Sequence, residues 1–369
     1  MTRTTAPRAP RFRRARRWAL AAASAPGAAA LAVAAAAWAF RDVPRYAGPE
    51  TFWALKGELE EARAELVTAS ETERGYEVRL RSTRGWSVDG YLRVPRNPDP
   101  GRPTVVVLGG IGTGRSAAEL VRTREPHVVL GLDYPWTGPR RPNFLHIARR
   151  LPDIRRAVLL TPAALLLAAD YLAGHAPTTD GGDGPGLIAI GASFGAPFAL
   201  AAAAADPRYD TALLIHGGGD LRRLVRWNLH RRYPHAPLWL ADIGARVLKP
   251  VEPTDHAPRL APRPLILVNG LHDDRIPAEC VSALYAAARE PKTLVWLPTP
   301  HIRPRDDALL HAIAEAAVRV LEAVRARTET HEPTPADGES ADADPDTADA
   351  RPRGELRAGS AAPKMRRVG

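Results

Sequence analysis

The sequence predicts an α/β fold built on a mixed, mostly parallel sheet that helices cover on both faces. Short runs that are apolar throughout are separated by longer helical stretches, as expected for strands buried on both faces of a parallel sheet. The runs cover residues 104–108, 127–132, 186–190, 211–216, 264–269 and 293–297. Ahead of them, residues 75–94 alternate apolar and polar side chains around a Thr-Arg-Gly turn, which predicts an antiparallel hairpin and so a mixed sheet.

The helical stretches alternate with these strands, as the fold requires. They cover residues 150–174, 194–205, 277–289 and 305–326. Residues 50–69 are rich in charge and predict a further amphipathic helix before the hairpin. An apolar content of 45% is sufficient for a hydrophobic core. The single cysteine, Cys280, excludes an intrachain disulfide framework and a cysteine-rich zinc site.

Residues 1–46 precede the predicted domain and carry an export signal. An uncharged segment of 23 residues, 18–40, follows an arginine-rich start and is long enough to cross a bilayer. Arginines before such a segment stay on the cytoplasmic side, so we expect everything after residue 40 to be exported. Ala37-Trp38-Ala39 is a candidate cleavage site. The segment therefore predicts either a cleaved signal peptide or a retained membrane anchor.

The net charge of +10 does not indicate a nucleic-acid-binding surface. Seven arginines lie in the first 17 residues, and removing their charge leaves only +3 for the rest of the chain. We therefore expect no nucleic-acid partner. Residues 327–369 hold almost no large apolar side chains and are predicted to be disordered, which limits the folded domain to residues 47–326.

The sharpest chemical signal is the segment Gly191-Ala192-Ser193-Phe194-Gly195, between a predicted strand and an alanine-rich helix. It matches G-x-S-x-G, in which the glycines permit a turn so sharp that the serine side chain projects from it. The serine then stands at a helix N-terminus, where N–H groups favour negative charge. The alternative is a glycine turn whose serine only caps the helix.

An acid and a histidine complete the set of residues needed for nucleophilic catalysis. Asp273 and His301 each follow another predicted strand, and the chain order Ser193, Asp273, His301 is that of one known triad. The carboxyl ends of parallel strands meet at one edge of a sheet, so we expect the three side chains to lie together. An imidazole, with a pKa of about 6.5, can take the serine proton near neutral pH. A carboxylate on its other nitrogen fixes the tautomer.

Residues 75–326 resemble the α/β-hydrolase superfamily, and most of all its exported esterase and dienelactone-hydrolase-like members. The segments G-A-S-F-G, G-L-H-D-D-R-I-P and P-H-I-R-P are similar to the family's three catalytic loops. The resemblance implies that Ser193 is the nucleophile, Asp273 the acid and His301 the base. It also implies a small-molecule ester as substrate, an acyl-enzyme intermediate, and neither a metal nor an organic cofactor. Asp274 is an alternative acid, but the G-x-x-D-x-x-[IV]-P spacing favours Asp273.

The glycine-rich loop 108–116 lies where α/β hydrolases supply an oxyanion donor. The resemblance therefore implies that the backbone N–H groups of Ile111 and Phe194 bind the anionic intermediate. A second glycine-rich segment, 216–220, imitates an oxyanion motif of lipases. It follows the nucleophile in the chain instead of preceding it, so we interpret it as a glycine turn after a strand.

Other interpretations remain open. The loop at 108–116 is also similar to a phosphate-binding loop, with Arg115 in place of the lysine and Asp133 as a candidate magnesium ligand. Arginine does not substitute well for that lysine, which makes P-loop-type nucleotide binding the less favoured alternative. A peptidase, thioesterase or acyltransferase could use the same triad. A binding module on a hydrolase scaffold would hold Ser193 away from His301.

Residues 220–259 fall where hydrolases insert lids, and we predict a small lid insert there. Trp227, Tyr233 and Trp239 of this segment either line a substrate pocket or pack the insert itself. The sequence does not predict an oligomeric state.

Overall fold

The computed structural model describes residues 48–121, 126–136, 138, 150–175, 186–303 and 305–329. The chain divides into two compact units, Met1–Arg327 and Thr328–Gly369, and the sheet and its helices belong to the first. The predicted export segment at 18–40 lies outside the described residues, as does nearly all of the predicted C-terminal tail.

The described strands form one nine-stranded sheet with the order β1-β2-β3-β5-β4-β6-β7-β8-β9. Along this order, the pairs β1–β2, β2–β3 and β3–β5 are antiparallel, and every later pair, from β5–β4 to β8–β9, is parallel. The mixed, mostly parallel sheet predicted from the sequence is therefore confirmed. The strands are β1 Leu59–Ala69, β2 Glu73–Ser82, β3 Ser87–Pro95, β4 Thr104–Leu108, β5 Val129–Leu132, β6 Leu187–Ala192, β7 Tyr209–Ile215, β8 Leu265–His272 and β9 Lys292–Pro300.

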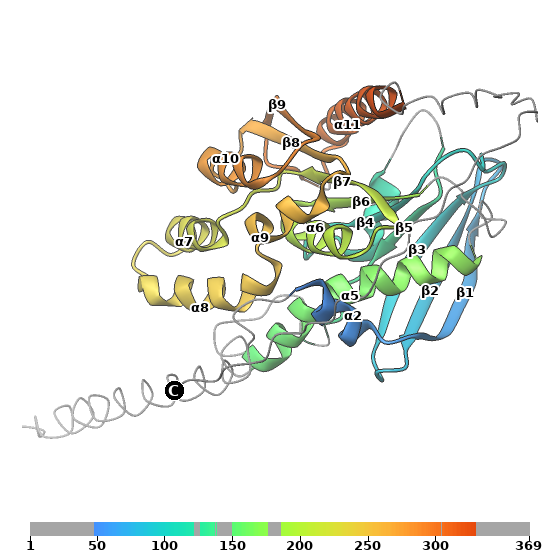
Figure 1. Ribbon diagram of the computed structural model, residues 1–369, viewed down its shortest axis with the longest axis horizontal. Helices are drawn as coiled ribbons and strands as arrows, with labels where there is room; N and C mark the ends of the chain where they lie inside the picture. The colour runs from blue at the N-terminus through green and yellow to red at the C-terminus, as the bar shows by residue number, and fades with distance from the viewer. Residues whose placement is uncertain are drawn as a thin grey trace, which may run out of the picture. The chain divides into compact units, whose positions relative to one another are not determined.

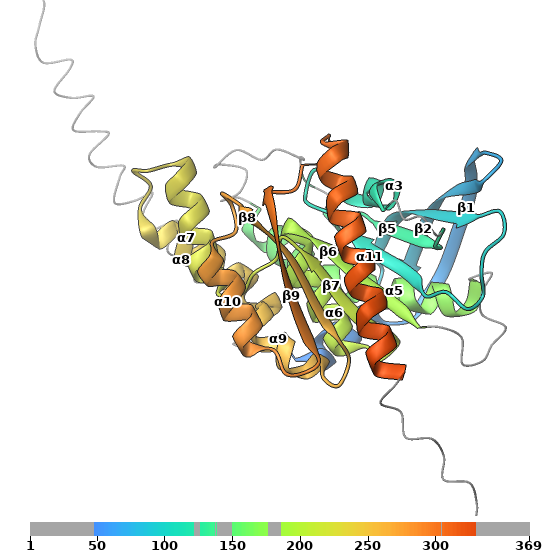
Figure 2. The same cartoon turned by 90° about the horizontal axis from the view of Figure 1, so that it is seen from above.

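Helices cover both faces of this sheet, and each face has its own apolar layer. Figure 1 shows the sheet with α11 above it and with α2 and α5 below it. The layer on the α5 face also takes side chains from α6, α9 and α10, whereas the layer on the other face takes them from α3 and α11. Figure 2 shows α11 crossing the strands on its own face. The bounds are α2 Pro49–Lys56, α3 Ala117–Leu120, α5 Leu151–His175, α6 Ala196–Ala205, α9 Pro253–Leu260, α10 Ala278–Ala287 and α11 Asp307–Glu329.

The apolar helix α5 lies in the interior of the protein. Among the described residues, it is the one helix long and apolar enough to span a membrane by length and composition, and most of it is buried in the protein. Its apolar side chains, including Leu165 and Leu166, belong to the core layer beneath the sheet.

The helix predicted over residues 50–69 is wrong beyond its first two turns. Helix α2 ends at Lys56, where Gly57 takes a left-handed φ of +65°, and strand β1 follows. The charged residues of β1 are stabilised by pairing with the basic strand β2, as in the ion pair of Glu60 with Arg81 at 3.0 Å. Local periodicity could not predict this, because the partner strand lies further along the chain.

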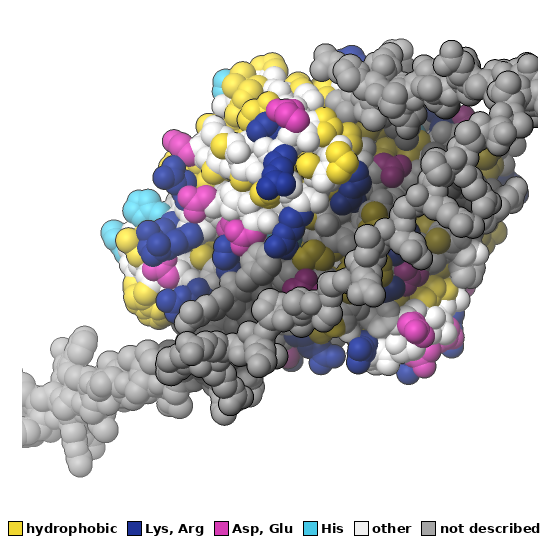
Figure 3. Space-filling view, viewed as in Figure 1, with side chains coloured by type: hydrophobic (Ala, Val, Ile, Leu, Met, Phe, Trp, Pro, Cys, Tyr) yellow, Lys and Arg dark blue, Asp and Glu magenta, His cyan; other side chains and the backbone are white. Residues whose placement is uncertain are grey.

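The predicted insert is helical and lies between β7 and β8. It comprises α7 Leu221–Arg232, α8 Leu238–Leu248, a short 3-10 turn at Lys249–Val251, and α9. Basic and histidine side chains gather over α7 and α8 beside apolar ones (Figure 3). Trp227, Tyr233 and Trp239 are 50%, 57% and 52% exposed, so they do not form a packed core for the insert.

The strand order changes direction at β4, which has β5 on one side and β6 on the other. Ligands of open α/β sheets bind outside the carboxyl ends of the strands at such a switch point. The glycine loop that follows β4 and Ser193, which follows β6, both lie there.

Candidate active site

Ser193 occupies a strained turn between β6 and α6. Its φ of +55° is left-handed, a conformation that non-glycine residues seldom adopt. The flanking glycines explain why the turn is possible. A Cβ at position 191 would come within 2.6 Å of Cα of Ala196, and a Cβ at position 195 would collide with the carbonyl oxygen of Leu108. The motif therefore lets the backbone at Gly195 approach the end of β4 closely.

His301 lies next to this serine. Oγ of Ser193 and Nε2 of His301 are 2.8 Å apart, although the residues are 108 positions apart in the chain. His301 follows β9 directly and is only 2% exposed. The Nδ1 atom of its ring faces the carboxylate of Asp273, at 2.9 Å from Oδ1 and 2.8 Å from Oδ2. An ionised carboxylate only accepts, so Nδ1 carries the hydrogen and Nε2 is free to accept the serine proton.

The loop after β8 fixes Asp273 in place. Oδ1 of Asp273 accepts hydrogen bonds from the backbone N–H groups of Arg275 at 2.8 Å and Ile276 at 3.0 Å. Burial alone would raise the pKa of this carboxyl. Hydrogen bonds from His216 and His301, the charge of His301 and the Arg275 N–H outweigh burial and hold the pKa of Asp273 well below its usual range. The group is therefore a carboxylate at neutral pH.

Two polar residues next to Asp273 take no part in the hydrogen bonds to Nδ1 of His301. Asp274 forms a surface ion pair with Arg231, in which Oδ2 lies 2.8 Å from Nη1, and the side chain of Asp274 is 57% exposed. His272 is exposed at the end of β8. The structure thus brings Ser193, Asp273 and His301 together and leaves both of these residues outside the hydrogen-bonded set.

A second histidine, His216, binds the same carboxylate and was missed in the sequence. Its Nδ1 lies 2.6 Å from Oδ2 of Asp273, its side chain is completely buried, and its φ is +52°. Its ring stands nearly perpendicular to that of His301, with centroids 5.2 Å apart. The interpretation of residues 216–220 as a glycine turn left out the hydrogen bond that His216 makes with Asp273. The position of His216 directly after β7 was the available signal, because the ends of β7 and β8 are neighbours.

The two proposed oxyanion donors lie beside the serine. Ile111 and Phe194 line the same cavity as Ser193. Tyr134 holds this arrangement, since its hydroxyl donates to the carbonyl of Gly109 at 2.5 Å and its ring lies 5.6 Å from that of Phe194. Burial raises the pKa of Tyr134 well above 10.0, so the hydroxyl keeps the hydrogen that it donates.

The same cluster also has the residue types of a metal site. His216, Asp273 and His301 offer ligand atoms that lie within 4.8 Å of one another. The hydrogen bonds among these three side chains already account for their closeness. Cys280 is a different case, because burial raises the pKa of its thiol to about 12 and keeps it from acting as a thiolate.

The loop after β4 has contacts that do not suit a phosphate cradle. The guanidinium of Arg115 pairs with Glu77 at 3.2 Å and with Asp133 at 3.7 Å. Asp133 also accepts the backbone N–H of Arg115 at 2.8 Å. Arg115 and Asp133, the basic group and the candidate magnesium ligand of the nucleotide hypothesis, are thus paired with each other.

No protein-family model matches the chain, and no curated protein matches it. Solved structures do match. Acetyl xylan esterase 1 from Thermoanaerobacterium sp. is 16% identical over 74% of this chain and 95% of its own, with a TM-score of 0.50. An acetyl xylan esterase from Paenibacillus sp. is 19% identical over 73% and 93%, with a TM-score of 0.49. The esterase domain of a Rhodothermus marinus protein is 19% identical over 66% and 96%, with a TM-score of 0.44.

At these identities the likeness concerns the fold alone. The chain has the α/β-hydrolase fold, with a nine-stranded sheet in its described part and helices on both faces. The prediction made from the three motifs is confirmed at that level.

Proposed function

We propose that the protein is a serine hydrolase that cleaves carboxylic esters. One observation supports this above all others: the continuous hydrogen-bonded chain from Oγ of Ser193 through His301 to the carboxylate of Asp273. A non-catalytic module would have no need for a strained serine within 2.8 Å of an imidazole. The solved structures with this fold include proteins named as esterases, which agrees with the proposal.

The chemistry follows from the geometry. Oγ of Ser193 attacks the ester carbonyl carbon while Nε2 of His301 takes its proton. The oxyanion that forms accepts hydrogen bonds from the N–H groups of Ile111 and Phe194. His301 then gives its proton to the departing alcohol, leaving an acyl group on the serine. Water, deprotonated by His301, attacks the acyl-enzyme and restores Ser193. The Asp273 carboxylate stabilises the imidazolium in both steps.

The test is labelling with a fluorophosphonate probe, with wild type and Ser193→Ala compared side by side. We expect labelling and hydrolysis of p-nitrophenyl acetate by the wild type, and loss of both in the variant. A folded wild type that does not react with the probe, or a variant labelled equally well, would contradict the proposal.

Thioesters, amides and acyl transfer to an alcohol would use the same residues, because the fold does not select the substrate. A thioester, a peptide amide and an alcohol acceptor can each be offered in parallel with the ester. We propose ester hydrolysis as the main activity, so we expect the ester to give the highest kcat/KM.

The predicted export segment supports a location outside the cytoplasm. We propose that residues 18–40 direct the domain across the membrane, either as a cleaved signal peptide or as an anchor. Fractionation of cells expressing the full chain tests this, because the mass of the mature protein distinguishes cleavage from retention. Full-length protein in the cytoplasmic fraction would contradict it.

A further inference from the structure

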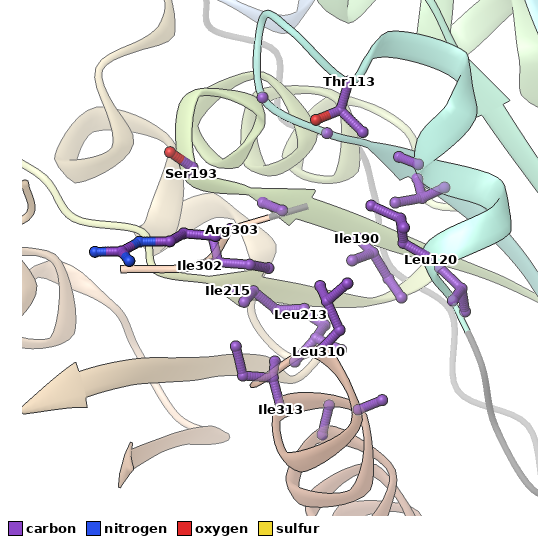
Figure 4. Close-up of a pocket in the computed structure, with 18 of the residues that line it drawn as sticks. Thr113, Leu120, Ile190, Ser193, Leu213, Ile215, Ile302, Arg303, Leu310 and Ile313 are labelled. Carbon is purple, nitrogen blue, oxygen red and sulfur yellow. The ribbon is translucent and has the colours of Figure 1, made fainter. Parts of the chain in front are cut away.

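A deep cavity opens beside Ser193 and continues beneath the edge of the sheet. Its volume is about 840 Å³. It is bounded on one side by the sheet and on the other by α3 and α11, within the apolar layer of that face. Figure 4 shows Ile190, Leu213 and Ile215 of the sheet across from Leu310 and Ile313 of α11. Protein interiors rarely leave voids much larger than a water molecule, so a hollow of this size requires an explanation.

The walls of the cavity are aliphatic. Three neighbouring strands contribute side chains from alternate positions, and these therefore face the same side of the sheet. They are Val105, Val107, Ile188, Ile190, Leu213 and Ile215. The opposite wall is made by α3 and α11. It includes Leu120, Leu310, Ile313, Ala317 and Leu321.

Polar groups are concentrated at the mouth. Ser193, Thr113 and His301 lie there, and the exposed residues Arg275 and Arg303 form part of its rim. At the far end, the polar side chain is that of His127, whose Nδ1 is hydrogen-bonded to the carbonyl of Pro103. The cavity is thus an aliphatic chamber with Ser193 at its polar mouth.

The register of the strands gives its depth. Gly191 pairs with Leu108 at the carboxyl edge, and Ile188 pairs with Val105 further in. From Gly109 at the mouth to Val105 the strand advances about 13 Å, at about 3.3 Å per residue. Helix α11 starts at the same edge and runs inward, which places Leu310 near the mouth and Ala317 deep in the chamber.

The insert does not shape this chamber. Trp227, Tyr233 and Trp239, the aromatic residues considered as pocket lining, are absent from its described walls. The aromatic lining residue Phe194 is next to Ser193 at the mouth, so a linear methylene chain matches the aliphatic walls further in better than a flat aryl group does.

We propose that the chamber is an acyl-chain site, and that the preferred substrates are esters of linear aliphatic acids of medium or greater length. This inference rests on the proposed ester hydrolysis at Ser193. The ester carbonyl is held at the mouth between Ser193 and the N–H groups of Ile111 and Phe194, while the acyl tail extends toward Val105. The bond from Oγ to the acyl carbon forms as the bond to the alcohol oxygen breaks, and the alcohol leaves with the proton from His301.

The experiment compares kcat/KM for p-nitrophenyl acetate, butyrate, octanoate and laurate. Each methylene that enters an apolar pocket adds to binding, so we expect octanoate to exceed acetate by about tenfold or more. A wild type that hydrolyses acetate at least as well as octanoate would overturn the acyl-chain site and leave the esterase proposal intact. A wild type inactive on the whole series, acetate included, would instead contradict the esterase proposal.

A variant tests the location of the site. Ala317→Phe places a ring in the deep part of the chamber, and we expect it to lower the ratio of octanoate to acetate turnover by about tenfold. Ala312→Phe is the matched control, because Ala312 is exposed on the same helix, and its ratio should equal that of the wild type. Equal ratios in a folded Ala317→Phe and the wild type would overturn the assignment. The wild-type series decides the matter if that variant does not fold.

The acyl chain could come from a dissolved ester or from a membrane lipid. Phosphatidylcholine vesicles and monomeric p-nitrophenyl octanoate, assayed in parallel for released fatty acid, distinguish these sources. Fatty acid released from the vesicles identifies a membrane lipid as a source, and hydrolysis of the octanoate ester alone identifies a dissolved ester, while the chain-length series decides the acyl-chain site itself. Hydrolysis in neither, by an enzyme active on acetate, would overturn it.

Discussion

His216 donates a hydrogen bond of 2.6 Å from Nδ1 to Oδ2 of Asp273, and both side chains are buried. The carboxylate that orients His301 is therefore itself held by a second imidazole. On the proposed mechanism His216 acts through Asp273, to which it is hydrogen-bonded, and is a positioning residue. Removing it leaves one carboxylate oxygen with a hydrogen bond from His301 alone.

His216→Ala should lower kcat by about tenfold or more, since a hydrogen bond to a charged group contributes about 1.5–3 kcal/mol. His216→Asn retains an N–H donor near the position of Nδ1 and should recover most of this loss. The measurement is steady-state kinetics on p-nitrophenyl acetate for both variants. Equal kcat values for the alanine and asparagine variants would show that the hydrogen bond has no part in catalysis.

The lowered pKa of Asp273 predicts how stability depends on pH. The pKa of Asp273 in the folded protein lies below its usual value of 3.8, so the unfolded state binds the proton more readily at acid pH. The stabilisation from this group is complete well above pH 3.8 and declines as the pH falls toward the folded pKa. Urea unfolding between about pH 3 and pH 6 should show a shallower decline for Asp273→Asn than for the wild type. Parallel curves for the two proteins would contradict this.

Tyr134→Phe should impair catalysis through the oxyanion loop. The change leaves the carbonyl of Gly109 without its donor, at a cost of about 1–3 kcal/mol, and frees the loop that carries Ile111. We expect lower kcat as well as lower stability. Tyr209→Phe is the matched control, because Tyr209 is another buried tyrosine whose hydroxyl donates to a backbone carbonyl, that of Leu165 at 2.7 Å.

The control should lose stability while kcat stays unchanged, since Tyr209 lies at the opposite end of β7 from the site. Thermal unfolding and kcat are measured for both variants. If the two variants lower kcat by the same factor, Tyr134 has no specific effect on the loop.

Gly191→Ala should destabilise the fold as well as the turn. The added methyl group would lie 2.6 Å from Cα of Ala196, and overpacking of this kind costs about 1–3 kcal/mol. Gly174→Ala provides the comparison, because a Cβ there meets nothing within 4 Å and the residue is in a helix. Urea unfolding should show a loss for the first variant and none for the second. An equal loss of stability in both variants would contradict the steric explanation for Gly191.

The parts of the site that were predictable are those carried by local motifs. Gly191, Ser193 and Gly195 form one short segment, and Asp273 and His301 each follow a strand whose apolar run is evident in the sequence. Neighbouring parallel strands end at the same edge, so the convergence of these residues follows from topology. Their catalytic roles remain a proposal.

The parts that were not predictable depend on contacts between distant segments. Strand β1 has a charge pattern compatible with a helix, and only its pairing with β2 determines its structure. His216 gains its importance from Asp273, 57 positions away. The cavity lies between the sheet and the helices α3 and α11, and how closely these elements pack is not recorded in any single stretch of sequence.

Strand β6 shows a further consequence of the alternation along a sheet. Ile188 and Ile190 face the chamber, while Ala189 between them faces the layer shared with α6. On the acyl-chain proposal, substrate range and thermal robustness are therefore encoded at interleaved positions of one strand. Selection or engineering can remodel one of these properties through the even-numbered residues while leaving the other largely untouched.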